Sequence, residues 1–151
     1  MVKAYITYIM KEINISFFVR RVTMKRELKE NVYLDALDMS IVQVKQTLNL
    51  LDRLTKNDLN INKNIIEKDM TKSILDLELS LASMCILLRK MSENQFIILP
   101  YNIRVDMNSI IHSNRFEYDD HIIVYSQRGR EEVDLDALMN YAYQVLKRQD
   151  I

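Results

Sequence analysis

Residues 34–54 read LDALDMSIVQVKQTLNLLDRL, and this stretch decides the fold class. Its apolar residues recur at alternating steps of three and four: Leu34, Leu37, Ile41, Val44, Leu48 and Leu51. The positions between them are mostly polar and include Asp35, Asp38, Lys45, Asn49 and Asp52. A spacing that averages about 3.5 residues puts the apolar side chains on one stripe of a long helix. We therefore predict a helix from about residue 24 to residue 54, with this stripe in the core.

The same alternation returns in residues 74–91, ILDLELSLASMCILLRKM. This second stripe consists of Ile74, Leu77, Leu81, Met84, Leu88 and Met91. It predicts a helix over about residues 64–92, and the Asn-rich segment 55–63 is then a loop between two helices. Two long helices joined by a short loop pack antiparallel, as in a helical bundle. Cys85, the only cysteine, lies among apolar neighbours and is interpreted as a small core residue.

The C-terminal third of the chain predicts shorter elements. A short helix is expected over about residues 102–113, followed by a β-hairpin with strands 116–118 and 121–125 around the turn residues Asp119 and Asp120. After residues 128–130 a last helix begins, with Asp134 as its N-cap. The buried face of that helix is predicted to consist of Leu135, Leu138, Ala142 and Val145. A single Gly and a single Pro leave few chain breaks, which favours a mostly helical fold.

Residues 1–23 fit two patterns. The spacing of Ile13, Ile15 and Phe17 suits a strand, whereas Tyr5, Ile9 and Ile13 suit a helix, and short apolar runs do not decide between the two. We treat residues 1–23 as an N-terminal appendage, a strand or short helix packed on the bundle or exchanged between bundles, and residues 24–151 as one helical domain. Charged residues interrupt the segment too often for an export signal, and no stretch approaches the ~20 apolar residues of a membrane span. We expect a cytoplasmic protein without membrane contact.

The charge balance argues against one class of nucleic-acid binder. Lys plus Arg and Asp plus Glu are equal at 21 each, so the chain lacks the overall positive field of a typical duplex-DNA binder. A local patch can still bind RNA, and Arg20, Arg21, Lys25 and Arg26 cluster beside two phenylalanines. Solvated basic side chains at a helix start are the alternative interpretation. The spacing of the cysteine and the two histidines fits no known metal site, and we expect no cofactor.

Three short segments of the C-terminal third carry a family resemblance. Residues 107–112 read MNSIIH, residues 116–123 read FEYDDHII, and residues 133–138 read VDLDAL. Together with the order of the predicted elements, they resemble the Arg-Asn-x-x-x-His segment, the following hairpin and the start of the last helix in the HEPN superfamily. The residue match covers about 104–146, and the first half matches only in architecture. The resemblance implies an all-α, up-down HEPN-like bundle with two long antiparallel helices and a small hairpin before the last helix.

The same resemblance implies a site. Active HEPN proteins carry an Arg, four to six residues and then a His, and they cleave RNA without a metal, usually with two motif copies at a dimer interface. His112 would be the catalytic acid or base, with Asn108 beside it. Met107 stands where the motif has its Arg, and Arg104 is the nearest upstream cation. Arg104, Asn108 and His112 share a helix face at i, i+4 spacing, so we expect Arg104 to stabilise the phosphate.

Arg115 and His121 also satisfy the literal spacing of the motif. They fall around the predicted hairpin, and we interpret their match as accidental.

The sequence leaves two functions open. One is a HEPN-like, RNA-directed protein, either a weak or degenerate metal-independent endoribonuclease of a toxin–antitoxin or phage-defence system, or a member that binds without cutting. Its expected partners are RNA, a second copy of the chain, and an antitoxin or other protein. The alternative is a non-enzymatic helical homodimer or adaptor. The position of His112 separates the two: a cleft or dimer interface near Arg104 favours the first, and a buried or isolated histidine favours the second.

Overall fold

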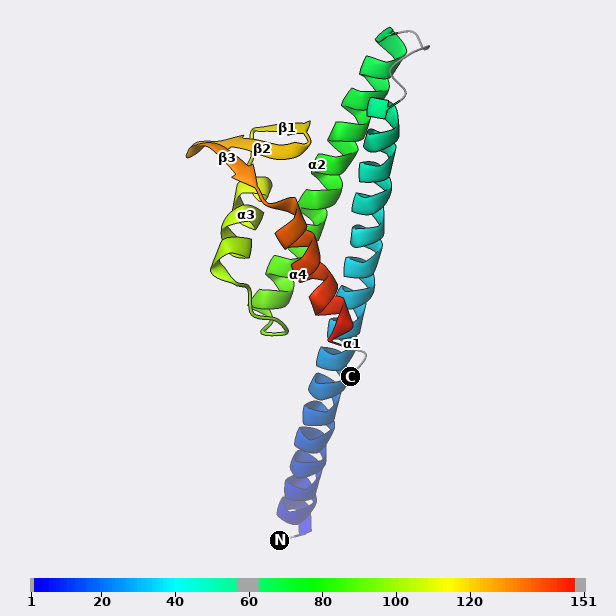
Figure 1. Cartoon of the computed structure of the whole chain (residues 1–151). Coiled ribbons are helices and arrows are strands. Elements are labelled where there is room, and N and C mark those ends of the chain that lie inside the picture. Colours follow the sequence, from blue (N-terminus) through cyan, green and yellow to red (C-terminus); the bar gives the residue numbers. More distant parts are fainter. Residues whose placement is uncertain (1, 57–62, 149–151) are drawn as a thin grey trace. The chain divides into compact units, whose positions relative to one another are not determined.

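The structure, a computed structural model, describes residues 2–56 and 63–148, with side chains described in residues 25–56 and 67–148. Within this part it contains four helices and one small antiparallel sheet (Figure 1), which confirms the prediction of a mostly helical protein. The chain forms two compact units, residues 1–33 and 34–151, which are described separately. No described helix combines the length and the apolar character that crossing a bilayer requires.

The first unit is helical. Helix α1, Val2–Lys56, begins in it and continues into the second unit. Residues 2–23, which the sequence left between strand and helix, belong to this helix, and the division of an appendage from the domain at residue 23 stays a prediction. Lys25 and Arg26 are exposed, and Arg20 and Arg21 are helical but have side chains outside the described part.

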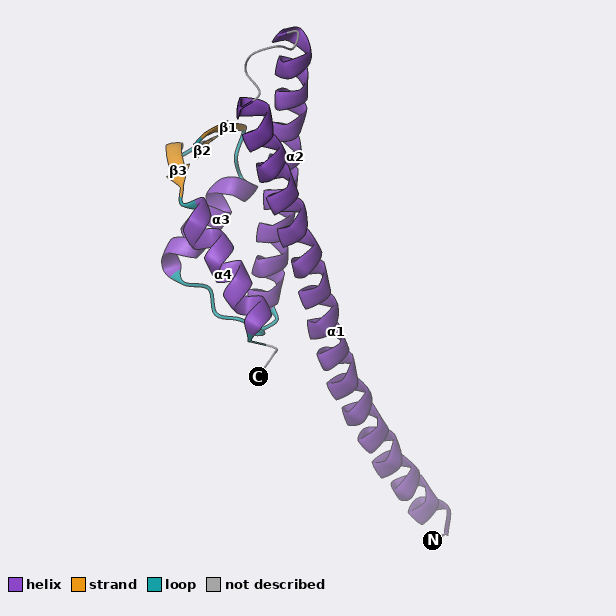
Figure 2. Cartoon of the chain, turned by 45° about the vertical axis from the view of Figure 1, so that its right-hand side comes forward, coloured by secondary structure: helices purple, strands orange, loops and turns teal. Residues whose placement is uncertain are grey.

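The second unit is built on a pair of helices. Residues 34–56 of α1 and helix α2, Lys63–Glu93, lie side by side and run in opposite directions (Figures 1 and 2). Most of both predicted stripes is buried, and the members with no exposed surface are Leu37, Val44, Leu51, Leu77, Leu81, Met84 and Leu88. Leu48 and Ile74 are only half-buried, and Leu48 lines an open hollow beside His121. Of the predicted loop 55–63, residues 55, 56 and 63 are helical, and 57–62 lie outside the described residues.

Helix α3, Tyr101–Ile111, follows α2 through a short connection. The N–H of Phe96 donates to the carbonyl of Met91 at 2.9 Å, which closes the C-terminal end of α2. The Tyr141 hydroxyl donates to the carbonyl of Ile98 at 2.6 Å and fixes the connection to the last helix, α4 (Leu135–Lys147). Pro100 is the N-cap of α3, and its carbonyl accepts the N–H of Arg104 at 2.9 Å.

Three strands form an antiparallel sheet in the order β1, Arg115–Asp119, β2, His121–Ser126, and β3, Gly129–Val133. Strands β1 and β2 confirm the predicted hairpin. The third strand corrects the prediction that residues 128–130 lead directly into the last helix. Its sequence, GREEV, has no alternation of apolar and polar residues. It pairs nonetheless, because Ser126 and Gly129 close a tight turn after β2 and Gly129 adopts a φ of +105° there.

Helix α4, Leu135–Lys147, begins where it was predicted to begin. The Asp134 carboxylate accepts a hydrogen bond from the N–H of Ala137 at 3.0 Å, so Asp134 is the N-cap. Leu138, Ala142 and Val145 are buried, whereas Leu135 is half-buried. Helices α3 and α4 and the sheet lie on one side of the α1–α2 pair (Figure 2), and the core lies between these two layers.

The single cysteine belongs to this core. Cys85, on α2, has no exposed surface, as predicted, and its burial raises the pKa of the thiol to about 12.

Candidate functional site

The site begins with the two faces of α3. An α-helix turns by about 100° per residue, so Arg104, Asn108 and His112 lie within an arc of about 80°. All three are exposed. On another side of the helix, Ile103, Met107 and Ile110 are buried in the core. The apolar residues therefore fix the rotation of α3, and this rotation presents the three predicted site residues to solvent.

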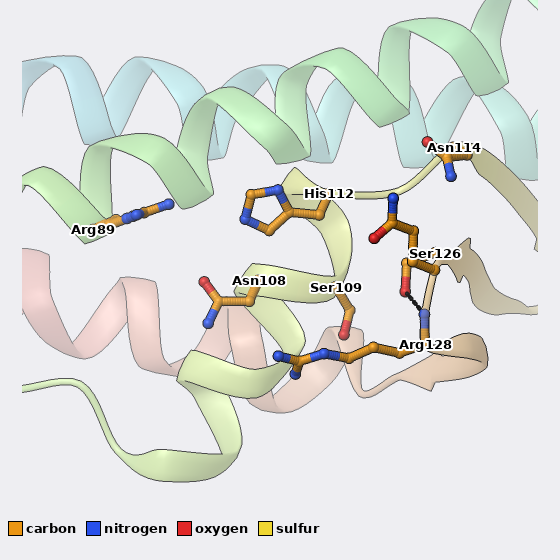
Figure 3. A pocket seen from close by; sticks show the side chains of 8 residues that line it. Arg89, Asn108, Ser109, His112, Asn114, Ser126 and Arg128 are labelled. Atoms are coloured by element: carbon orange, nitrogen blue, oxygen red, sulfur yellow. Dashed lines mark hydrogen bonds between the residues drawn. The ribbon is translucent and has the colours of Figure 1, made fainter.

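His112 lines an open hollow of about 540 Å³ (Figure 3). The hollow is formed by residues from α2, α3, the α3–β1 connection and the segment around the β2–β3 turn: Arg89, Asn108, Ser109, His112, Asn114, Ser126, Gln127 and Arg128. Figure 3 shows Arg89 pointing from α2 toward the imidazole ring, while the Arg128 side chain extends past Ser109 toward Asn108. Two guanidinium groups and one imidazole thus face a single polar cavity.

Arg104 lies in an adjoining hollow of about 270 Å³. Arg89 and Asn108 line both hollows, so the two adjoin each other, and we call them together the α3 trough. The remaining residues of the smaller hollow are Ser92, Glu93, Leu99, Arg104 and Met107. The structure therefore brings Asn108 and His112 into one cavity and places Arg104 next to it. His112 is neither buried nor isolated.

Backbone contacts hold the histidine in place. His112 is the C-cap of α3, and its N–H donates to the carbonyl of Asn108 at 3.0 Å. The N–H of Asn114 donates to the carbonyl of Tyr125 at 2.7 Å, which ties the end of α3 to β2. The N–H of Arg128 donates to the Ser126 hydroxyl at 3.2 Å and shapes the turn from which the Arg128 side chain starts (Figure 3).

Ser109 connects α3 to the third strand. Its hydroxyl is hydrogen-bonded to the carbonyl of Val105 at 3.0 Å and to the carboxylate of Glu131 on β3. Ser109 is buried and Glu131 is half-buried, so this hydrogen bond is partly shielded from water. It positions the β2–β3 turn, and with it Arg128, against α3.

The charges of the trough are mostly positive. Arg89, Arg104 and Arg128 line it, and the acidic residue that its lining contains within the described part of the chain is Glu93. Glu93 forms an ion pair with Arg89, with Nε and Oε1 3.4 Å apart, and both side chains are about half exposed. Exposed pairs of this kind are weak, so an anion can compete with Glu93 for the guanidinium.

An acidic group lies on a different edge of α3. Asp106 is half-buried near Asp134 and Glu131, and its carboxylate accepts the N–H of Asp134 at 3.3 Å. Burial raises the pKa of Asp106, the two neighbouring carboxylates raise it further, and the hydrogen bond opposes the shift. Asp106 is turned about 160° from Asn108 around the helix, so this group does not belong to the trough.

Two other sequence predictions concern residues away from the trough. Arg115 and His121 start β1 and β2, and the register places them at opposite ends of the hairpin. Arg115 pairs with Glu117, and His121 lies with its Nδ1 3.3 Å from the carboxylate of Glu132, so the two do not form an Arg–His site. The basic cluster at residues 20–26 belongs to the other unit, and its role in binding RNA stays a prediction.

The sequence did not identify Arg89 and Arg128 as site residues. Arg89 continues an apolar spacing on α2 that runs through Leu75, Leu79 and Ile86, and a cation in such a series is a usable signal. Arg128 precedes the only glycine, which marks a turn. Neither signal says that the two residues meet beside His112, because they come from elements far apart in the chain.

No metal cluster accompanies these side chains: among the described residues, no group of three or more His, Cys, Asp or Glu is placed to hold an ion. The trough itself offers guanidinium groups that bind anions, an amide that forms hydrogen bonds and an imidazole that exchanges protons.

No protein-family model, no curated protein sequence and no solved structure matches the chain. The resemblance to the HEPN superfamily therefore rests on the residues quoted from the sequence.

Proposed function

We propose that this chain is a HEPN-like, RNA-directed protein that binds RNA in the α3 trough. The observation that carries the proposal is the convergence of His112 with Arg89, Asn108 and Arg128 in one open polar hollow. Arg104 lies in the adjoining hollow, where it can bind a second phosphate of the same strand. The HEPN resemblance supplies the reaction class and the expectation of a toxin–antitoxin or phage-defence role.

The proposed reaction uses the 2′-hydroxyl of RNA as its nucleophile. The 2′-oxygen forms a bond to the neighbouring phosphorus, the P–O5′ bond breaks, and the products are a 2′,3′-cyclic phosphate and a 5′-hydroxyl. One proton leaves the 2′-hydroxyl and one reaches O5′, and His112 carries one of these transfers. Water or His112 of a second copy carries the other. Arg89 and Arg128 stabilise the charge that develops on the phosphate oxygens.

We expect the rate of cleavage to be low. Met107 replaces the motif Arg, and its side chain is buried, so position 107 contributes no cation to the trough. The three arginines of the trough come from other positions, and Arg104 lies outside the hollow that contains His112. Productive geometry depends on sub-ångström placement, and cations assembled from other elements favour binding over efficient cleavage.

A cleavage assay on a panel of single-stranded RNAs tests the proposal. His112→Ala should abolish cutting, and EDTA should leave the wild-type rate unchanged. His121→Ala is the matched control, because His121 is exposed, lies on the sheet and is paired with Glu132. Arg104→Ala should reduce binding of the same RNAs in a filter or anisotropy assay. Cutting that requires an added metal, or that survives His112→Ala, would contradict the mechanism.

The alternative function, a non-enzymatic homodimer, is favoured by a different observation. The α1–α2 pair has a second set of apolar side chains that is exposed: Met39, Val42, Leu50, Leu75, Leu79 and Ile86. A shallow hollow of about 370 Å³ between the two helices is lined by Leu79 and by polar side chains, and among the described residues of its lining Asp76 is the charged one. The lining of this hollow carries little charge, so two copies can meet there without strong like-charge repulsion, and we propose a second copy of this chain as the occupant.

A further inference from the structure

Tyr101 is a strongly exposed aromatic residue to which the proposed function gives no role. It is the first residue of α3, and 83% of its surface is exposed. At about 100° per residue, Tyr101 falls between Arg104 and His112 in the same arc of about 80°. It therefore extends the row of site residues toward the N-terminal end of the helix: an aromatic ring, a guanidinium, an amide and an imidazole.

We propose that Tyr101 is a stacking platform for one base of a single-stranded RNA that runs along α3. The inference rests on the proposed function and adds the form of the substrate and its placement. A rise of about 1.5 Å per residue puts Tyr101 and His112 about 16 Å apart along the helix axis, a span of a few nucleotides. The phosphates between the stacked base and the reacting phosphate then pass Arg104 and Arg89.

Charge alone leaves this trough a modest binder. The whole chain has equal numbers of acidic and basic residues, and Glu93 already forms an ion pair with Arg89. Stacking supplies affinity that does not depend on charge, since every base has a π-face that an exposed aromatic ring can cover. An exposed tyrosine in the same row as Arg104, Asn108 and His112 meets this need.

The same geometry selects single strands over duplexes. In a duplex the base faces are covered by their neighbours, and Tyr101 has nothing to stack on. In a single strand the bases can turn away from the backbone, so the phosphates contact the arginines while a base covers the ring. The structure thus assigns a substrate with unpaired bases near the cleaved bond.

A binding experiment on the full chain tests the platform. The probe is a fluorescent single-stranded RNA with 2′-O-methyl groups, which lacks the nucleophile and cannot be cut during the measurement. Tyr101→Ala should weaken binding by roughly 5- to 150-fold, the loss expected for one base stacked on an aromatic ring. Tyr101→Phe keeps the ring and should leave the affinity unchanged. Ile98→Ala, which removes another strongly exposed apolar side chain just before α3, is the matched control and should also have no effect.

Two more probes separate stacking from other roles. A strand of abasic residues keeps the phosphates, so it should bind more weakly to the wild type and be insensitive to Tyr101→Ala. A duplex of the same sequence should also bind more weakly. If Tyr101→Ala binds like the wild type while Arg104→Ala does not, the platform is wrong and the proposed function stands. If Tyr101→Phe loses as much as Tyr101→Ala, the hydroxyl acts and stacking is wrong. If the wild type binds no RNA, the proposed function falls as well.

Discussion

Asp106 lies where α3 meets the start of α4, and its ionisation affects the stability of this junction. Burial and two neighbouring carboxylates raise its pKa in the folded protein above the value in the unfolded chain. A carboxyl of this kind binds its proton more tightly when folded, so it favours folding as the pH falls toward the ordinary aspartate range and opposes folding once it is charged.

Asp106→Asn should therefore raise the free energy of unfolding at pH 7. The asparagine oxygen can still accept the N–H of Asp134, and the unfavourable charge is gone. The gain should shrink as the pH falls through the raised folded pKa and disappear at about pH 3, well below the ordinary aspartate pKa of about 3.9, where the wild-type group is protonated in both states. Urea titrations at the two pH values measure it. Asp38→Asn, the same replacement at an exposed position on α1, is the control, and an equal gain there would contradict the explanation.

Met107 shows why the family motif cannot simply be restored. The side chain is buried, although it borders the smaller hollow of the trough, so Met107→Arg buries a charge and should lower the free energy of unfolding by about 3–5 kcal/mol. Met107→Leu, of similar volume, should cost less than about 1.5 kcal/mol. Thermal melts of the two variants test this comparison. A folded Met107→Arg protein with wild-type stability would mean that the arginine reaches the trough.

At the scale of elements, the residues of the two apolar stripes differ in burial, so their replacement by alanine should differ in its cost to stability. Leu81→Ala should cost about 2–5 kcal/mol, because Leu81 has no exposed surface and its loss leaves a cavity. The sequence assigned Leu48 the same role, but the structure leaves it half-buried beside an open hollow, so Leu48→Ala should cost clearly less. Urea unfolding of both variants gives the comparison, and equal losses would contradict the assigned burial.

The helices were predictable and the third strand was not, for a physical reason. The stripe through Leu37, Ile41 and Val44 repeats over many turns, so one sequence pattern fixes both the helix and its buried face. Strand β3 has a single apolar residue, Val133, and exists because β2 offers it hydrogen bonds and Ser109 binds its Glu131. Such partners are tertiary contacts, which a local pattern does not contain.

The candidate site also contains residues that a local pattern predicts and residues that only tertiary packing brings together. Arg104, Asn108 and His112 belong to one helix, so their shared face followed from their spacing alone. Arg89 and Arg128 reach the trough from α2 and from the β2–β3 turn, and only the packing of α3 against both brings them there. The spacing of Arg115 and His121, which satisfied the motif as well, proved to span a hairpin, as the sequence suggested.

At the scale of the whole molecule, the exposed apolar face of the α1–α2 pair predicts self-association. Light scattering should give the mass of a dimer at micromolar concentrations. Leu79→Glu should raise the dissociation constant by roughly 100-fold or more, because a symmetric interface loses the apolar side chain twice and gains two facing charges.

Ile98→Glu is the control for this prediction. It places the same charge on an exposed apolar residue outside the α1–α2 face, and the variant should remain a dimer. A wild-type protein that keeps a monomer mass across this concentration range would rule out the homodimer.

The burial of Cys85 has a practical consequence for any such experiment. With its pKa near 12, the thiol is almost wholly protonated at neutral pH, and solvent does not reach it. Alkylating reagents can then modify it only when the packing of α2 opens, so the labelling rate reports that opening without a spectroscopic probe. Since Cys85 is the only cysteine, a covalently linked pair of chains on a non-reducing gel would be a record of unfolding and not of native assembly.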